Sequence, residues 1–125
     1  MNLDAEISTW LDEFADCVRQ RDTDRARPMF SSSCFSYGTR VAEADGLDAL
    51  VKHQWAPIWE TTSGFVFEPN SIHVMAAKDG SVHVVAGRWS SVGTDLRQGR
   101  CTLVLQRDAE QGDLVAVHSH FSLVP

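Results

Sequence analysis

The spacing of apolar residues changes once along this 125-residue chain, near Phe65, and that change limits what the chain can fold into. Before Phe65, apolar residues recur every three or four positions, which is typical of amphipathic helices. After Phe65, apolar and polar residues alternate in runs separated by turn residues, which is typical of β-strands. Helices followed by a block of strands predict an α+β protein, with helices layered on a curved antiparallel sheet.

The first half of the chain predicts three helices and one short strand. The first helix covers about residues 4–21, and Asp22 caps a short second helix. A strand is expected at residues 34–37, and the third helix opens at Gly46. Because a proline inside a helix has no N–H to donate, Pro57 should kink or break the third helix.

The second half predicts a meander of long antiparallel strands. The chain shows no internal repeat, linker or low-complexity tract, and its length suits one core. We therefore expect a single domain over residues 1–125. The expected strands cover residues 65–68 leading into 72–77, then 82–91, 100–107 and 114–123, with turns at 78–80 and 109–113.

Charge and cysteine content limit the expected partners and cellular location. The 11 basic residues against 17 acidic ones give a net charge of -6, which argues against nucleic acid or an anionic membrane as a partner. No apolar run approaches the ~20 residues of a membrane span, and the first residues lack the pattern of a secretory signal. The three cysteines form neither a disulfide framework nor a zinc pattern. We expect a soluble cytoplasmic protein.

Polar residues gather on the last two expected strands. A turn between these strands would bring five polar side chains into one neighbourhood of an otherwise apolar sheet: Arg100, Thr102, His118, His120 and Ser122. Such groups have to bond to each other, to a ligand or to a second subunit. The strand pattern leaves these three possibilities open.

Four stretches carry a resemblance to a known superfamily. They are Gly46–Leu50, Gly87–Trp89, Gly99–Leu105 and Val117–Ser122. The chain resembles the nuclear-transport-factor-two-like superfamily, which includes ketosteroid isomerases and polyketide cyclases, and the last two stretches are similar to its SnoaL-like subgroup. The resemblance implies a cone-shaped curved antiparallel sheet with three helices from the N-terminal half on its concave face, a cystatin-like α+β barrel. It also implies an apolar pocket at the wide end and a dimer interface on the convex side.

Seven aromatic residues are candidates for lining that pocket. Each alone is best explained as a packing residue, since aromatic side chains are highly buried on average. Together, aromatic side chains over a concave sheet would form a large apolar lining. Such a lining suits a hydrophobic small molecule, cyclic ones included, and needs no cofactor. The candidates are Trp10, Phe14, Tyr37, Trp55, Trp59, Trp89 and Phe121.

The two neighbouring histidines allow three interpretations. Inside the pocket, His118 and His120 could act as a general base or as donors to a substrate. On the convex face, they would join Arg100, Thr102 and Ser122 in a homodimer interface. A metal site would need a third ligand, which the sequence does not supply nearby, so we expect no metal. Resemblance to the isomerases places Phe121 in the pocket, and the alternation of the strand then puts His118 and His120 on the interface side. Shifting the alignment by one residue would exchange the two faces for every side chain of the strand.

Steroid-type isomerisation does not fit the residues present. That chemistry requires a carboxylate base on the strand before the third helix, and a carboxylic acid with a tyrosine as oxyanion donors. Ser36 and Tyr37 stand where the base would be, and residues 101–105 carry no acid. If the chain is an enzyme, the remaining chemistry is metal-free proton transfer, with Tyr37, His118 or His120 as the acting residue. The alternatives are therefore a small-molecule-binding domain, with or without isomerase-, cyclase- or hydrolase-like activity, and a non-catalytic homodimeric domain.

Overall fold

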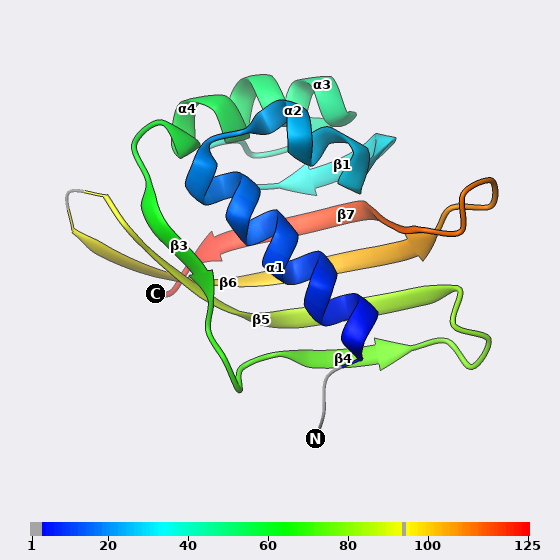
Figure 1. Cartoon of the computed structure of the whole chain (residues 1–125). Coiled ribbons are helices and arrows are strands. Elements are labelled where there is room, and N and C mark those ends of the chain that lie inside the picture. The colour runs from blue at the N-terminus through cyan, green and yellow to red at the C-terminus, as the bar shows by residue number, and fades with distance from the viewer. Residues whose placement is uncertain (1–3, 94) are drawn as a thin grey trace.

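The computed structural model describes residues 4–93 and 95–125, and its first helix follows the predicted pattern closely. Helix α1 (Ala5–Gln20) begins at Asp4, whose carboxylate accepts hydrogen bonds from the backbone N–H groups of Glu6 and Ile7. It ends at Arg21, which takes a left-handed conformation with φ of 56°. The helix lies across the sheet (Figure 1), and its apolar stripe is buried against it. That stripe consists of Ile7, Trp10, Leu11, Phe14, Ala15, Cys17 and Val18.

The second and third predicted helices are both present, and the third is irregular. Helix α2 (Thr23–Ala26) is capped by Asp22 and continues into the short 3-10 turn η1 (Arg27–Met29). The third comprises α3 (Leu47–Leu50), the π-helical turn η2 (Val51–Trp55) and α4 (Ala56–Trp59). The irregularity expected from Pro57 thus takes the form of a widened turn, which accommodates a residue that has no N–H to donate.

Seven strands form one curved, unclosed sheet (Figure 1). The order across it is β2-β1-β7-β6-β5-β3, and β4 also pairs with β5. Among residues 4–93 and 95–125, no helix is long and apolar enough to cross a membrane. The strands are β1 (Phe30–Tyr37), β2 (Ala44–Asp45), β3 (Ser63–Phe67), β4 (His73–Ala76), β5 (Val82–Val92), β6 (Leu96–Arg107) and β7 (Leu114–Leu123).

The sheet departs from a simple antiparallel meander in two places. Strands β5, β6 and β7 follow the meander. Strand β1, however, pairs with the last strand, β7, and this pairing is parallel. Strands β3 and β4 pair with opposite ends of β5, since Phe67 lies opposite Trp89 whereas His73 lies opposite Ala86. They therefore occupy one edge of β5 in succession. The two-residue strand β2 was not predicted.

All helices of the described chain lie on one face of the sheet, the concave face, and the core fills the space between (Figure 1). Val85, Leu103, Leu105 and Ala116 point into this core and are fully buried. The ring of Phe14 is at its aromatic centre. Six other aromatic rings have centroids 5.4–6.5 Å from it: Trp10, Phe30, Trp55, Trp59, Phe67 and Phe121.

A surface ion pair ties the start of α1 to the end of β6. The guanidinium of Arg107 donates to both carboxylate oxygens of Glu6, at 2.9 and 3.0 Å. Hydrogen bonding to Arg107 is the main cause that holds the pKa of Glu6 below its ordinary value. The stability from this pair is therefore present above the ordinary glutamate pKa and is lost as the pH falls through the lowered one.

We expect Glu6→Gln to lower the melting temperature by about 1–4 °C at pH 7, because exposed ion pairs contribute little. The difference from the unsubstituted protein should be smaller at pH 3 than at pH 7, because protonation of Glu6 increases as the pH falls toward its lowered pKa. Thermal unfolding of both proteins at the two pH values measures this. An equal difference at pH 7 and pH 3 would mean that the ion pair is not the cause.

Candidate functional site

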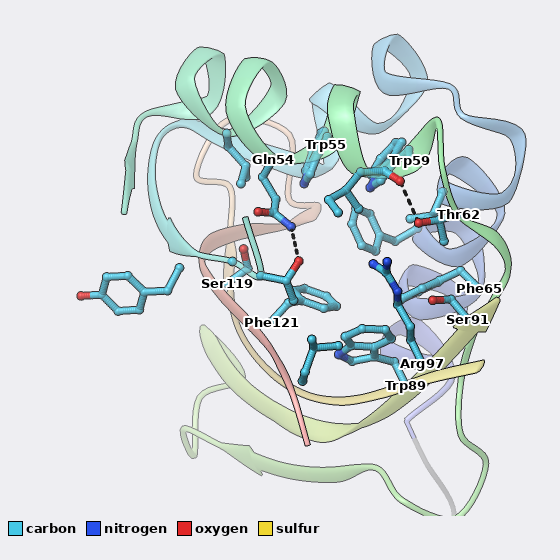
Figure 2. A pocket seen from close by; sticks show the side chains of 18 residues that line it. Gln54, Trp55, Trp59, Thr62, Phe65, Trp89, Ser91, Arg97, Ser119 and Phe121 are labelled. Carbon is cyan, nitrogen blue, oxygen red and sulfur yellow. Dashed lines mark hydrogen bonds between the residues drawn. The ribbon is translucent and has the colours of Figure 1, made fainter. Parts of the chain in front are cut away.

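A cavity lies where the helices meet the concave face (Figure 2). Its volume is about 60 Å³. A cavity of about 150 Å³ holds benzene, so a ring-sized ligand would require side chains at the mouth to move. The residues that line it are Phe14, Val18, Tyr37, Gly38, Thr39, Leu50, Gln54, Trp55, Ile58, Trp59, Thr62, Phe65, Trp89, Ser91, Arg97, Ser119, Phe121 and Leu123.

Aromatic side chains account for seven of the 18 residues that line the cavity (Figure 2). Trp55 and Trp59 are stacked, with ring centroids 4.9 Å apart, because the helical segment presents both on one side. Across the cavity, the indole of Trp89 stacks at 5.8 Å on the ring of Phe65. Phe121 on β7 completes the wall, 6.3 Å from Trp89. The wall is therefore built from helices and strands distant in sequence.

Two of the seven predicted lining residues are placed differently. Trp10 is absent from the wall and stacks on Phe14 in the core, with ring centroids 5.4 Å apart. Tyr37 borders the cavity, but its ring lies 5.4 Å from His118 and His120, on the other face of the sheet. The reason is that Tyr37 pairs with His120 across β1 and β7, and paired residues share a face. The other five predicted residues, Phe14, Trp55, Trp59, Trp89 and Phe121, lie on the wall.

Gly99 on β6 makes room for the indole of Trp89. A Cβ atom at this position would overlap both that indole and the backbone carbonyl of Ser122. The indole Nε1 donates to the backbone carbonyl of Arg100 at 3.2 Å. The Trp89 side chain therefore lies close over β6, and glycine is what permits this contact.

Gln54 is a site residue that the sequence analysis missed. It is buried, and its side-chain oxygen accepts hydrogen bonds from the backbone N–H groups of Arg40 and Val41, at 2.8 and 3.1 Å. Its amide nitrogen donates to the hydroxyl of Thr39 at 2.9 Å. Gln54 thereby fixes the loop after β1 to the π-helical turn at the edge of the cavity. A polar residue beside Trp55, on the apolar side of the helix, was the available signal.

The remaining polar groups of the wall are mostly satisfied within the protein. The hydroxyls of Ser36 and Ser119 are 2.8 Å apart and both residues are buried. Thr62 donates its hydroxyl to the carbonyl of Ile58 at 2.7 Å. Among the described lining residues there is no Asp, Glu or His, and Arg97 is the one charged side chain. The cavity thus offers an apolar surface with a single cation.

The predicted interface residues lie on the opposite, convex face of the sheet. In the register of β6 and β7, Arg100 pairs with Ser122 and Thr102 pairs with His120. His118 shares that face and places its Nδ1 2.8 Å from the carbonyl oxygen of Phe35. The interpretation that puts the two histidines inside the cavity does not fit this geometry, because Ser119 and Phe121 point there instead.

The cysteines are poor nucleophiles in this environment. Cys17, Cys34 and Cys101 are all free and buried. Burial raises the pKa of the Cys101 thiol to about 12, and it raises the pKa values of the other two thiols as well. Over residues 4–93 and 95–125, no three side chains of His, Cys, Asp or Glu converge as a metal site would require.

Comparisons with known proteins agree on the fold. A search of curated proteins finds no match. Among solved structures, a nuclear transport factor 2 superfamily protein from Salmonella enterica is 16% identical, with a TM-score of 0.79 over 96% of this chain and 89% of that one. A ketosteroid isomerase-like protein from Erwinia carotovora is 13% identical, with a TM-score of 0.79 over 97% and 95%. A cystatin-like fold protein from Nostoc punctiforme is 15% identical, with a TM-score of 0.77 over 100% and 96%.

These structural matches confirm the predicted α+β cone with helices on a curved sheet. At such low identity they show the fold alone. The sequence itself matches the family model of the SnoaL-like domain over residues 7–125, which is nearly the whole chain. On this evidence, the chain belongs to the SnoaL-like domain family.

Proposed function

We propose that this chain binds a hydrophobic small molecule in the concave cavity. The observation that carries the proposal is the wall itself, in which Trp55, Trp59, Trp89, Phe65 and Phe121 face one space. Small-molecule sites are concave and mostly apolar, with a few polar groups that fix the ligand's orientation. Here Arg97, Ser91 and the Gln54 side chain are such polar groups.

The lining favours binding over proton-transfer catalysis. A general base has to lie within hydrogen-bonding distance of the proton it removes. The described wall contains no carboxylate or imidazole, and the hydroxyls of Ser119 and Thr62 are engaged within the protein. We therefore propose a ligand-binding role without isomerase, cyclase or hydrolase activity.

The size of the cavity also limits the shape of the ligand. A ring needs more than the present volume of about 60 Å³, so the mouth has to open. Leu123 is 48% exposed and Arg97 is half-buried, so both can move without breaking the core. Flat or slender ligands should therefore bind more readily than bulky ones.

A thermal-shift screen of hydrophobic molecules tests the proposal, with single-ring aromatics included beside steroid, polyketide and terpenoid scaffolds. A ligand at 100 times its dissociation constant should add about 2.7 kcal/mol to the free energy of unfolding. Ser91→Leu would fill the cavity from a buried wall position and should abolish the shift. Ser90→Leu is the matched control, because the side chain of Ser90 points to the convex face, away from the cavity.

Two results would contradict the binding proposal. One is a screen with no reproducible shift from any scaffold. The other is a shift that persists unchanged in Ser91→Leu, which would place the ligand elsewhere on the protein.

We also propose that the convex face joins two copies of the chain. No helix of the described chain covers this face, and it carries the exposed side chains of Phe35 and Met75, which are 45% and 67% exposed. An uncovered apolar sheet face is stabilised when a second surface buries it. A second copy would place the same residues on both sides of a two-fold axis, as the family resemblance implies. The two histidines, Arg100, Thr102 and Ser122 would then meet their counterparts.

Thr102→Glu tests the dimer, because it puts a charge in the middle of the proposed interface, beside His120. We expect sedimentation equilibrium to give twice the chain mass for the unsubstituted protein and the single mass for the variant. Lys52→Glu, on an exposed helix position, is the control and should stay dimeric. A monomeric unsubstituted protein at micromolar concentration, or a dimeric Thr102→Glu, would contradict this proposal.

A further inference from the structure

We infer that the ligand of the concave cavity carries a carboxylate, which Arg97 binds at the mouth. This inference rests on the proposed binding function and narrows it to a chemical class. An amphipathic monocarboxylic acid would place its apolar body among the aromatic rings and its charged end beside the guanidinium.

Arg97 is placed so that its side chain reaches the cavity. It lies on β6 directly opposite Ser91 of β5, so its side chain belongs to the concave face. Figure 2 shows the guanidinium pointing into the cavity, between Trp89 and the helices. A Cβ atom added at Gly93 would lie 3.4 Å from both Arg97 Nε and the carbonyl oxygen of Thr61. The side chain therefore runs past Gly93 of the β5–β6 hairpin, and the turn after α4 lies close to the same glycine.

Arg97 also lacks a counter-charge among the described residues. Five of the eight other arginines have a carboxylate within 4 Å: Arg19, Arg25, Arg27, Arg88 and Arg107. Within the part of the chain that the structure describes, no carboxylate lies within that distance of Arg97. A half-buried cation without an anion carries a desolvation penalty that a bound anion relieves.

The guanidinium of Arg97 suits a carboxylate in both charge and geometry. A guanidinium is planar and presents paired N–H donors, which match the two oxygens of a carboxylate. The neighbouring wall residues Ser91 and Thr62 are uncharged, so no acid of the cavity wall competes for the cation. The net charge of -6 does not oppose this, because exposed charges are screened beyond about 8 Å at physiological salt.

A comparison of acids with their amides tests the inference, since each pair has nearly the same shape and differs in charge. We would titrate hexanoate, phenylacetate and naphthylacetate, each against its amide, and follow tryptophan fluorescence and calorimetry. In the unsubstituted protein the acid of the best-binding pair should have a dissociation constant about tenfold lower than its amide.

Arg97→Gln should remove this preference while changing the affinity for the amide by less than about twofold. Arg97→Lys should restore part of it, because the charge returns without the planar pair of donors. Arg25→Gln is the control for net charge, because Arg25 is not a cavity residue and pairs with Asp16. It should keep the full preference for the acid.

Each other outcome overturns the inference in a distinguishable way. If amides bind as tightly as acids, the carboxylate is not recognised, although the binding function stands. If Arg97→Gln weakens acids and amides equally, Arg97 only packs against the ligand. If no acid or amide binds and the thermal-shift screen is also flat, the proposed function fails and the inference with it.

Discussion

Phe14→Ala is expected to lower the free energy of unfolding by about 3–5 kcal/mol, the range usual for removing a buried aromatic ring. Phe14 is only 2% exposed and its ring contacts aromatic neighbours from α1, the third helical segment, β1, β3 and β7. Since it joins both layers of the fold, little of the resulting cavity can close. Urea unfolding should show the loss as a lower midpoint.

The control for Phe14→Ala removes a large apolar side chain from the surface. Leu96 is 67% exposed, so Leu96→Ala should change the free energy of unfolding by less than about 0.5 kcal/mol. Comparable losses in the two variants would show that the aromatic cluster does not hold helices and sheet together.

Gly99→Ala is expected to destabilise the protein by about 3 kcal/mol although it adds one methyl group. The new Cβ would overlap the indole of Trp89 and the backbone carbonyl of Ser122. The indole can rotate away, but the carbonyl belongs to the β6–β7 pairing, so the strands have to separate locally. Displacing the indole should also change the tryptophan emission and reduce ligand binding in the cavity.

Gly87→Ala is the matched control on the neighbouring strand. There the added Cβ meets the end of the Ile72 side chain, which can change rotamer without moving the backbone. Gly87→Ala should therefore be clearly more stable than Gly99→Ala. Equal stability of Gly99→Ala and the unsubstituted protein, with an unchanged emission spectrum, would contradict the contact described for Trp89.

The helices could be predicted from sequence because their apolar faces repeat with the helical period and their first residues are caps. Asp22 caps α2 as predicted, and Asp4, which was predicted only as the start of the first helix, caps α1. Strand β1 was predicted to begin four residues too late, since Ser31, Ser32 and Ser33 show no alternation of apolar and polar residues. The parallel pairing of β1 with β7 joins segments about eighty residues apart, and no local pattern in one sequence reports such a contact.

Part of the candidate site could also be predicted from the sequence. Periodicity assigned Trp55 and Trp59 to the apolar side of their helix, and the superfamily resemblance added Trp89 as a pocket residue; the structure places all three on the cavity wall. Arg97 and Gln54 could not be assigned to the cavity in this way. A charged or amide side chain is expected to be solvent-exposed unless the strand register or the irregularity of its helix is known. The π-helical turn at residues 51–55 is such an irregularity, and it sets where Gln54 lies.

The most direct test of a binding site on the concave face is an NMR titration of the ¹⁵N-labelled protein with the strongest ligand from the thermal-shift screen. The cavity assignment predicts the largest shifts at the side-chain amide of Gln54 and at the indole N–H groups of Trp55, Trp59 and Trp89. The indole of Trp10, which lies off the wall, should move least among the four tryptophans. Shifts concentrated on Tyr37, His118 and His120, with the three cavity indoles unmoved, would contradict a binding site on the concave face.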